Sequence, residues 1–399
     1  MNKLIDRIKH CTETYLSDTL TIRRLLHQHP ELSFNEFKTS AFIASKLTDL
    51  GIDLKKDIAQ TGIIGIIRGE KPSTRVIGLR ADMDALPIKE ETGVDYQSLN
   101  PGVMHACGHD LHTACLLGTA RILQELKSEF GGTVLLIFQP GEEKLPGGAK
   151  LILEDELFEQ YKPQLVIGQH VLPTLEAGKV GFRNGKYMAS CDEIYLTVEG
   201  QGGHGAMPFQ LNDTVLIASH IIVALQQIVS RNANSFTPTV LSFGKVIADG
   251  ATNIIPDKVY LEGTFRTMDE QWRYQAHEKI TRIATSIAQS MGASCKVNIM
   301  KGYPSVYNQP EMTNKASDAA RELLGKEAVV ETEMRMTADD FAYFSQKYPS
   351  VYYRLGVGYP GGKNAPLHSS LFSLNEDAVK TGVETMAWLT CAFLNQVKD

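Results

Sequence analysis

Four short apolar segments decide the fold: TGIIGIIRG at 61–69, RVIGLRADMD at 75–84, GGTVLLIFQP at 131–140 and QLVIGQHV at 164–171. Each is a run of aliphatic and β-branched residues with glycine, proline or charged residues at its ends, which is typical of buried strands. A helix is expected between the second and third segments, from about His112 to Glu129. Strands that alternate with helices predict an α/β fold with a largely buried sheet, and such sheets bind ligands beside the ends of their strands.

The order of strands and helices changes after about Gly178. Residues 191–303 predict a strand, a helix, two strands, a long helix from Asp269 to Met291 and a last strand. This β-α-β-β-α-β order makes a small α+β unit of the ferredoxin-like kind. Because 399 residues are too many for one ordinary core, we expect a main domain at 1–182 and 304–399 with this unit inserted at 183–303. A strand at 351–358 and an amphipathic helix from Asn375 to Val397 complete the main domain.

Composition and charge exclude several classes of partner. The chain has 40 Lys and Arg against 46 Asp and Glu, a net charge of −6, and no block of like charges, so no nucleic-acid partner is expected. It has no run of 18 apolar residues that would predict a membrane span, and its first residues show helical spacing rather than a signal peptide. The six cysteines lack the spacing of a disulfide framework. We therefore expect a cytoplasmic protein.

The segment Met104-His-Ala-Cys-Gly-His-Asp-Leu-His112 brings three imidazoles, a thiol and a carboxylate into nine residues. Cys107 and His109 are two residues apart, so both can face one side of an extended or turning backbone, and Gly108 between them permits a turn. A thiolate and imidazoles suit Zn²⁺ or a similar first-row ion and disfavour calcium and magnesium. The segment therefore predicts a metal site, in which some of the histidines can still be structural.

Further candidate ligands follow other predicted strands. Pro140-Gly-Glu-Glu143 comes directly after the third strand, and adjacent residues of an extended segment project to opposite sides. One of the two carboxylates can therefore bind a metal while the other faces a water molecule. His170 ends the fourth strand, and His368 lies in a later loop, NAPLHSS. Each of these residues alone is unremarkable, but together with the cysteine-containing segment they form a ligand set.

The order of the motifs resembles a known family. RADMDALPI, MHACGHDLHTA, FQPGEE, GQH, GGHGAMP, TNIIP, GTFR, ADDF and LHSSLF follow one another as in metal-dependent amidohydrolases of the aminoacylase and carboxypeptidase superfamily. The resemblance is to the branch of hippurate hydrolase, N-acyl-amino-acid amidohydrolase and the auxin-conjugate hydrolases, and it covers about residues 20–395. It implies a two-metal, aminopeptidase-like catalytic domain with an inserted lid or dimerisation domain, and hence a homodimer.

Carried onto this sequence position by position, the resemblance gives each candidate a role. It implies five metal ligands: Cys107, His109, Glu143, His170 and His368. It makes Glu142 the general base and Asp84 the carboxylate that orients a ligand histidine. Relatives outside this branch have a histidine where Asp82 stands, and the cysteine-containing segment would compensate for its absence.

The predicted insert contributes three more candidates. His204 lies in the glycine-rich turn Gly202-Gly-His-Gly-Ala206, which suits a group that reaches toward a ligand. By the resemblance, His204 stabilises the developing oxyanion and is delivered across the dimer. Asn253 and Arg266 resemble the family's contacts to the substrate carboxylate, for which the planar fork of an arginine is suited. Plain surface exposure is the alternative for His204, and a structural ion pair is the alternative for Arg266.

Three motifs depart from the family pattern. The common FQPAEE is FQPGEE here, and Ser370 replaces a frequent proline. The usual Ser-Glu-Asp-Phe is Ala338-Asp-Asp-Phe341, which shortens one carboxyl side chain near the expected site and leaves the role of Asp339 open.

The resemblance implies hydrolysis of N-acyl amino acids, such as N-acetyl or N-benzoyl derivatives, to a carboxylic acid and a free amino acid. It also implies two divalent metal ions, for which Zn²⁺ is the first expectation and Mn²⁺ the next. The alternatives among enzymes are a dipeptidase, an aminopeptidase or an N-acetyl-diaminopimelate deacetylase. The alternative outside enzymes is a catalytically silent metal-binding module, against which the intact Glu142 argues because pure binding needs no base.

Overall fold

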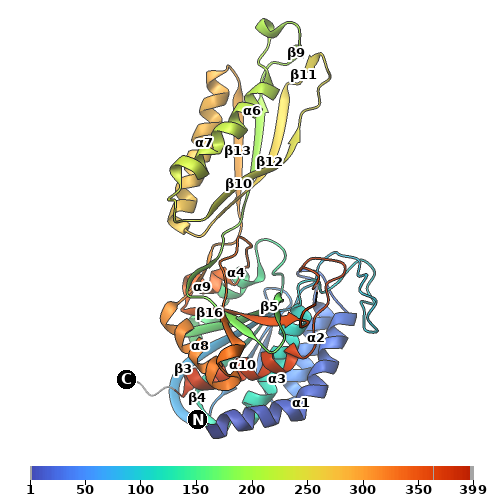
Figure 1. The fold of residues 1–399 in the computed structure, drawn as a ribbon, viewed down its shortest axis with the longest axis vertical. Coiled ribbons are helices and arrows are strands. Elements are labelled where there is room, and N and C mark those ends of the chain that lie inside the picture. The colour runs from blue at the N-terminus through green and yellow to red at the C-terminus, as the bar shows by residue number, and fades with distance from the viewer. Residues whose placement is uncertain (1, 363, 396–399) are drawn as a thin grey trace. The chain divides into compact units, whose positions relative to one another are not determined.

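A computed structural model describes residues 2–362 and 364–395, and within them the chain divides into two compact units (Figure 1). The second unit comprises Lys186–Val306 and Met334–Ala342, and the first unit comprises the rest. The expected insert at 183–303 did not include the segment 334–342. That segment joins the second unit because its backbone pairs with the start of the insert: Arg335 N donates to Tyr187 O at 2.9 Å, and Ala189 N donates to Arg335 O at 3.1 Å.

The first unit is built on an eight-stranded mixed sheet. Its strands, in spatial order, are β1 (Asp53–Ile58), β2 (Gly62–Arg68), β4 (Gly131–Gln139), β3 (Lys71–Asp82), β5 (Leu165–Glu176), β16 (Ser350–Gly358), β6 (Val180–Phe182) and β15 (Val329–Glu331). The four central strands β4, β3, β5 and β16 are mutually parallel. Their carboxyl ends therefore meet at one edge of the sheet, as expected of an α/β fold.

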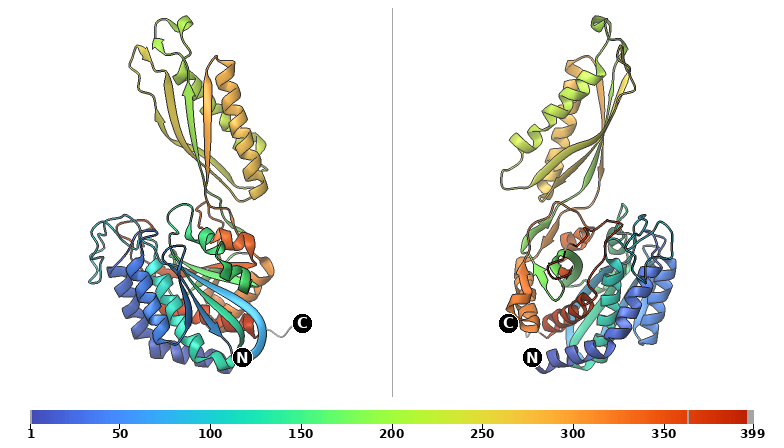
Figure 2. Two further views of the ribbon diagram at one scale, coloured as in Figure 1. Left: turned by 180° about the vertical axis from the view of Figure 1, so that it is seen from behind. Right: turned by 45° about the vertical axis from the view of Figure 1, so that its right-hand side comes forward.

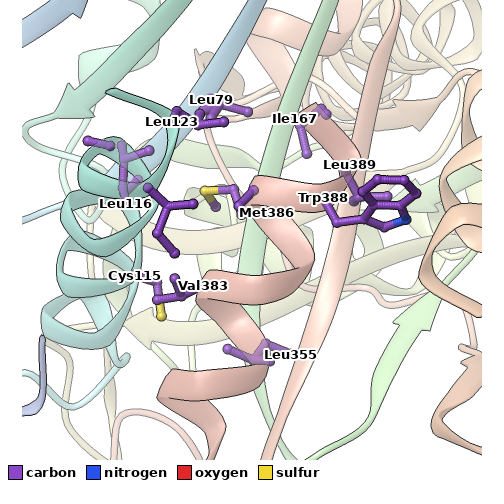
Figure 3. Packing of buried hydrophobic residues seen from close by; sticks show 14 of the residues in the cluster. Leu79, Cys115, Leu116, Leu123, Ile167, Leu355, Val383, Met386, Trp388 and Leu389 are labelled. Atoms are coloured by element: carbon purple, nitrogen blue, oxygen red, sulfur yellow. The ribbon is translucent and has the colours of Figure 1, made fainter. Parts of the chain in front are cut away.

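Helices cover the sheet of the first unit. The long ones are α1 (Asn2–Gln28), α2 (Phe37–Asp49), α3 (His109–Glu125), α8 (Pro310–Leu324) and α10 (Ala378–Leu394). Figure 3 shows Cys115 and Leu116 of α3 packed toward Val383 and Met386 of α10, and all four are buried. The last helix was expected to reach Val397, which lies outside the described residues.

Short elements complete the first unit and the segments that connect the two units. They are α4 (Gly148–Leu153), α5 (Glu156–Tyr161), α9 (Ala342–Lys347), β7 (Gly185–Met188) and β14 (Val306–Asn308). The helix expected from His112 begins three residues earlier, at His109. Gly108 explains this start: it stands before the helix with φ 81°, in a conformation that side chains rarely adopt, and a Cβ there would lie 2.8 Å from Val171 Cγ2.

The second unit confirms the predicted β-α-β-β-α-β order. Its elements are β8 (Asp192–Glu199), α6 (Thr214–Leu225), β10 (Thr239–Ile247), β12 (Lys258–Thr267), α7 (Glu270–Ser290) and β13 (Ser294–Lys301). The antiparallel sheet has the order β10-β12-β8-β13, and both helices cover the same face of it (Figure 2). A small two-stranded antiparallel sheet, β9 (Gly203–His204) with β11 (Ile254–Ile255), extends this unit and was not predicted.

One stretch of the second unit, Thr214–Asn232, is long and apolar enough to cross a membrane, with a mean hydropathy of 1.4 over 18 residues. It consists of α6 and a following π-helical turn. One side of it is buried in the core of this unit through Ile217, Ile221, Leu225 and Ile228, and 33% of the stretch is buried. A core helix passes the same test of length and composition, so the stretch is weak evidence for a membrane span.

A buried ion cluster ties α7 to the sheet of the second unit. Asp192 is fully buried and accepts hydrogen bonds from Arg273 Nε at 2.9 Å, His277 Nε2 at 2.7 Å and Gly302 N at 3.1 Å. Burial alone would raise the pKa of Asp192, but the hydrogen bonds from Arg273 and His277 outweigh it and hold that pKa below its usual value. The ionised carboxylate is therefore part of the folded state.

Replacing this carboxylate should destabilise the second unit. Asp192→Asn should lower the free energy of unfolding by about 3–5 kcal/mol, because it removes the main partner of the buried Arg273 guanidinium. Since the folded-state pKa is depressed, the stabilisation is present above the unfolded pKa and is lost as the pH falls through the folded one. Urea unfolding followed by Trp272 fluorescence, in a Trp388→Phe background, measures this difference.

Asp249→Asn, at an exposed loop position of the same unit, is the control. Equal losses in the two variants, or a loss for Asp192→Asn that does not shrink in acid, would contradict this account of the cluster.

Candidate metal centre

The carboxyl ends of the parallel strands bring the five predicted ligands of the first unit together. Cys107 and His109 stand at the start of α3, Glu143 follows β4, His170 lies on β5 and His368 is in the loop after β16. Their donor atoms form two groups whose members lie within 4.8 Å of one another: Cys107, His109 and His170, and Cys107, Glu143 and His368. The thiol belongs to both groups, so it stands between two possible metal positions.

His170 does not end its strand, as the sequence indicated, because β5 continues to Glu176. Pairing with β3 stops at Gly168, opposite Arg80, and beyond it β5 pairs with β16 alone. The ring of His170 therefore stands at the edge where β3 has ended. Its Nδ1 lies 2.8 Å from the carbonyl oxygen of Val171 and donates to it, which leaves the lone pair of Nε2 for a ligand, 3.5 Å from Cys107 Sγ.

His109 is oriented in the same manner by Asp84. Its Nδ1 lies 2.9 Å from the backbone oxygen of Asp84 and 3.3 Å from Oδ1, so Nδ1 carries the proton. Within the described residues, the buried Nε2 of His109 has no hydrogen-bond partner. A buried lone pair without a donor is costly unless a cation binds it, so this atom fits a metal ligand. The whole donor set, one thiol, three imidazoles and a carboxylate, fits a first-row divalent ion.

The third imidazole of the segment, His112, is structural. Its Nδ1 donates to Asp82 Oδ1 at 2.5 Å and its Nε2 accepts from Val171 N at 3.0 Å, so neither nitrogen is left for a metal. Asp82 also accepts from the buried Arg80 at 2.5 Å. Burial alone would raise the pKa of Asp82, but Arg80 and the neighbouring histidines hold it well below its usual value. Where other branches have a histidine, this chain thus has a fixed buried anion.

His105, the remaining imidazole of the segment, is buried, and burial lowers its pKa to about 4. Within the described residues neither of its ring nitrogens has a hydrogen-bond partner. Of the segment's three histidines, only His109 belongs to a donor group that contains Cys107.

Asp84 holds more than the ligand histidine. Its Oδ2 accepts from Ser33 Oγ at 2.6 Å and from the backbone N–H of Glu143 at 3.0 Å. The same carboxylate therefore fixes both a predicted ligand on α3 and the turn that carries the two glutamates. Ser33 was not predicted, because nothing in the sequence relates it to a residue fifty positions later.

The two glutamates and His368 close the other side of the centre. Glu142 is buried, and Glu143 Oε1 lies 3.1 Å from His368 Nε2. His368 has φ 62°, a strained conformation for a residue with a side chain, and its N–H donates to Ala106 O at 2.9 Å. This contact keeps the loop beside Cys107.

Ser370, the residue that replaces the family's proline, adds two contacts to this loop. Its hydroxyl donates to Glu91 Oε2 at 3.0 Å, and its carbonyl accepts from Glu91 N at 2.8 Å. Of these two contacts, only the hydroxyl one depends on the serine, because a proline also has the carbonyl.

Cys107 and His368, which both belong to the second donor group, carry protons in the metal-free protein. Burial, together with the charge of Glu143, raises the pKa of the Cys107 thiol. Hydrogen bonds with Cys107 and Glu143 raise the pKa of His368 to about 10. A divalent cation reverses this balance, because it binds the thiolate and the neutral imidazole and releases their protons.

The second unit places His204 and Asn253 together and Arg266 apart from them. His204 pairs with Ile254, and Gly205 N donates to Asn253 O at 2.9 Å. Arg266 stands near the far end of β12 and donates to Met336 O at 3.1 Å. Eight residues of extended strand separate Lys258, where β12 begins, from Arg266, a span of about 26 Å. Asn253 and Arg266 of one chain therefore cannot contact the same carboxylate.

Two further observations concern predicted residues of the second unit. Ala206 N donates to His204 Nδ1 at 3.1 Å, so the proton of the neutral ring is on Nε2, which is a hydrogen-bond donor. Asp339 is buried, and its Oδ1 accepts from Phe341 N at 2.9 Å. The shortened carboxyl of the ADDF segment thus has a local structural contact.

Comparison with known proteins was made on this basis. The sequence profile of "Peptidase family M20/M25/M40" matches residues 78–390. N-acyl-L-amino acid amidohydrolase of Geobacillus stearothermophilus is 40% identical over 77% of this chain and 82% of that protein. N-acetyl-L-cysteine deacetylase of Bacillus subtilis is 38% identical over 90% of this chain and 84% of that protein. Thermostable carboxypeptidase 1 of Saccharolobus solfataricus is 37% identical over 98% and 100%.

A solved structure shares the fold. The YXEP protein of Bacillus subtilis, described as a dinuclear metal-binding peptidase from the M20 family, is 33% identical and superimposes with a TM-score of 0.84 over 96% of this chain and 100% of that one. The matched profile and these relatives each span most of the sequence, and they agree with the resemblance that the motifs carried. The chain therefore belongs to peptidase family M20/M25/M40.

Proposed function

We propose that this protein is a metal-dependent amidohydrolase that cleaves N-acyl amino acids to a carboxylic acid and a free amino acid. The observation that carries the proposal is the pair of donor groups that share Cys107, with the buried Glu142 beside them. Relatives named for amidohydrolase and deacetylase activity at 38–40% identity support it. The intact base argues against a silent metal-binding module.

The donor groups support two divalent metal ions, and the structural relative described as dinuclear supports the same number. Cys107, His109 and His170 would hold one ion, and Cys107, Glu143 and His368 the other. Zn²⁺ is our first choice because thiolate and imidazole are borderline-soft ligands, and Mn²⁺ is the next. When bound, such ions polarise the amide carbonyl and lower the pKa of a water molecule.

The chain's own residues do the rest of the chemistry. Glu142 takes a proton from the attacking water and passes it to the leaving amine, while its neighbour Glu143 serves as a ligand. The N–H at Nε2 of His204 donates to the developing oxyanion, a contribution of about 3–4 kcal/mol for such donors in other enzymes. Asn253 and Arg266 bind the carboxylate of the amino acid.

The names amidohydrolase and carboxypeptidase, which these relatives carry, refer to the cleavage of one kind of bond. In an N-acyl amino acid, and at the C-terminus of a peptide, the amide to be cut lies next to a free carboxylate. An arginine that recognises the carboxylate serves both substrates, and the acyl side alone distinguishes them. A dipeptidase or aminopeptidase must also bind a free amine, and an N-acetyl-diaminopimelate deacetylase must bind a second charged end.

A substrate screen separates these alternatives. The protein loaded with Zn²⁺ or Mn²⁺ should hydrolyse N-acetyl and N-benzoyl amino acids faster than dipeptides of the same C-terminal residue, and it should fail on the corresponding amino acid amides, which lack the carboxylate. Release of free amino acid is the measurement. Faster turnover of unblocked dipeptides would favour the peptidase alternative.

Substitution of the adjacent glutamates tests their roles separately. Glu142→Gln should abolish turnover and keep the metal content of the wild type, because the base is not a ligand. Glu143→Gln should lose metal as well as activity, since it removes a charged ligand. Metal analysis of the purified variants, beside kcat, gives both answers, and equal loss of metal in the two variants would mean that the roles are assigned wrongly.

We also propose a homodimer in the cytoplasm, without a nucleic-acid or membrane partner, and features of the second unit support the dimer. Val215, Leu216 and Val223 of α6 are exposed apolar residues, and β10 is an edge strand of the sheet. Pairing of two such edges satisfies exposed backbone groups on both copies. A dimer also accounts for the distance between Asn253 and Arg266 within one chain. Asn253 and His204 of one subunit can complete a site that uses Arg266 of the other.

Subunit mixing tests the shared site. His204→Ala and Glu142→Gln are each inactive, but their heterodimer contains one site with both defects and one site with neither. Up to about a quarter of wild-type activity should return, because random pairing makes half of the dimers mixed and each has one intact site of two. If subunit exchange is verified and no activity returns, His204 acts in its own subunit or has no part in catalysis.

A further inference from the structure

Glu36 is a buried carboxylate beside the centre to which no role has been given so far. It stands at the position that precedes α2, where a side chain commonly caps the helix, but its carboxylate does not cap. Glu36 is fully buried, and its side chain turns inward. Oε1 accepts from the backbone N–H of Gly141 at 2.9 Å, and Oε2 accepts from Thr61 Oγ1 at 2.6 Å.

Two buried carboxylates described above, Asp82 and Asp192, have a basic partner, and Glu36 has none in the part of the chain that the structure describes. Asp82 pairs with Arg80, and Asp192 pairs with Arg273. Burial, followed by the negative charge of Asp84, raises the pKa of Glu36 to about 7. A buried acid without a cation is costly to the fold, so its presence calls for a task that an apolar residue could not perform.

The turn that Glu36 contacts leaves little freedom. Gly141 has φ 60°, and a Cβ there would lie 2.4 Å from the ring of Phe34, so the turn is packed directly against the segment that contains Glu36. Gly148 N donates to Gly141 O at 3.1 Å, which ties the turn to the start of α4. Hydrogen bonds thus fix both the N–H and the carbonyl of Gly141.

Residues 33–36 hold the peptide of Glu142 at two points. On its N-terminal side, the N–H of Gly141 is bound by Glu36 directly. On its C-terminal side, the N–H of Glu143 is bound by Asp84, whose Oδ2 in turn accepts from Ser33. The two clamped N–H groups stand one residue before and one residue after Glu142. Its backbone position is therefore set by two carboxylates that both depend on one short segment.

We propose that Glu36 is a positioning residue that fixes the general base Glu142 through the N–H of Gly141. The inference rests on the proposed function, since it takes Glu142 as the base. Glu36 itself touches neither the donor groups nor the substrate position, and it acts by holding the backbone to which Glu142 is attached. Because a small misplacement of a catalytic group slows the chemical step more than it weakens binding, the effect belongs in kcat.

Two substitutions of opposite kind test the proposal. Glu36→Gln removes the charge but keeps the length and an oxygen that accepts from Gly141 N, while the Thr61 hydroxyl can accept from its amide. Glu36→Asp keeps the charge but is one methylene too short to reach both partners. If Glu36 positions Glu142, the Glu36→Gln variant retains kcat. The Glu36→Asp variant then has a kcat lower by about 10- to 100-fold, with KM and metal content unchanged.

A second readout does not depend on activity. In the metal-loaded protein, hydrogen exchange of the peptide that contains residues 140–143 should be faster in Glu36→Asp than in the wild type and close to wild type in Glu36→Gln. The matched control is Glu384→Gln, a buried glutamate of α10 whose pKa is likewise raised by burial. Its kcat and its exchange at 140–143 should stay those of the wild type.

The outcomes separate the proposal from its alternatives. If Glu36→Asp is active and Glu36→Gln is inactive, the charge matters rather than the position, and the proposal is wrong. Unchanged kcat and exchange in both variants, with a loss of thermal stability only, would show a structural role and also overturn it. A wild-type protein that hydrolyses no N-acyl amino acid refutes the proposed function instead, while the exchange rates still decide whether Glu36 holds the turn.

Discussion

The parallel pairing of β3 between β4 and β5 is the constraint on which the candidate centre depends. The register sets Asp82 opposite Gln139 and Arg80 opposite Gly168, so β3 and β4 end together near the level of His170, while β5 continues to Glu176. A shift of one residue would turn every side chain of β3 to the other face of the sheet. Donors that are far apart in the sequence can meet without a dedicated loop because the sheet brings the ends of these strands to one edge.

Backbone and carboxylate contacts then decide which nitrogen of each histidine is free. Asp84 binds the Nδ1 proton of His109, and the carbonyl of Val171 binds that of His170, so both rings turn Nε2 toward Cys107. His112 uses both nitrogens within the protein. The orientation of these two candidate ligands is thus fixed before a metal arrives, because ring orientation and proton position are already set by the fold.

The sequence predicted most of the first unit because its signals are local. Apolar runs bounded by turn residues gave the central strands, and glycine beside Cys107 gave the turn before α3. The residue pattern alone could not separate His109 from His112, since their difference is which atoms face them after folding, and only the family resemblance named His109 as a ligand. His170 was placed at a strand end because no local signal shows that β5 outlasts β3. The segment 334–342 and the clamp at residues 33–36 depend on pairings between distant residues, which one sequence does not reveal.

The proposed roles of Asn253 and Arg266 bear on whether the site is made by two chains. A strand is stiff, and β12 holds Lys258, which follows the segment of Asn253, about 26 Å from Arg266 whatever the second unit does as a body. Two groups that bind one small carboxylate must lie within a few ångströms of it, so a single rigid unit cannot supply both. A lid of one chain could carry either the arginine or the pair His204 and Asn253 to a substrate. If Asn253 and Arg266 bind the substrate carboxylate as proposed, a second copy has to bring the other group, and dimer formation would then be a condition for catalysis.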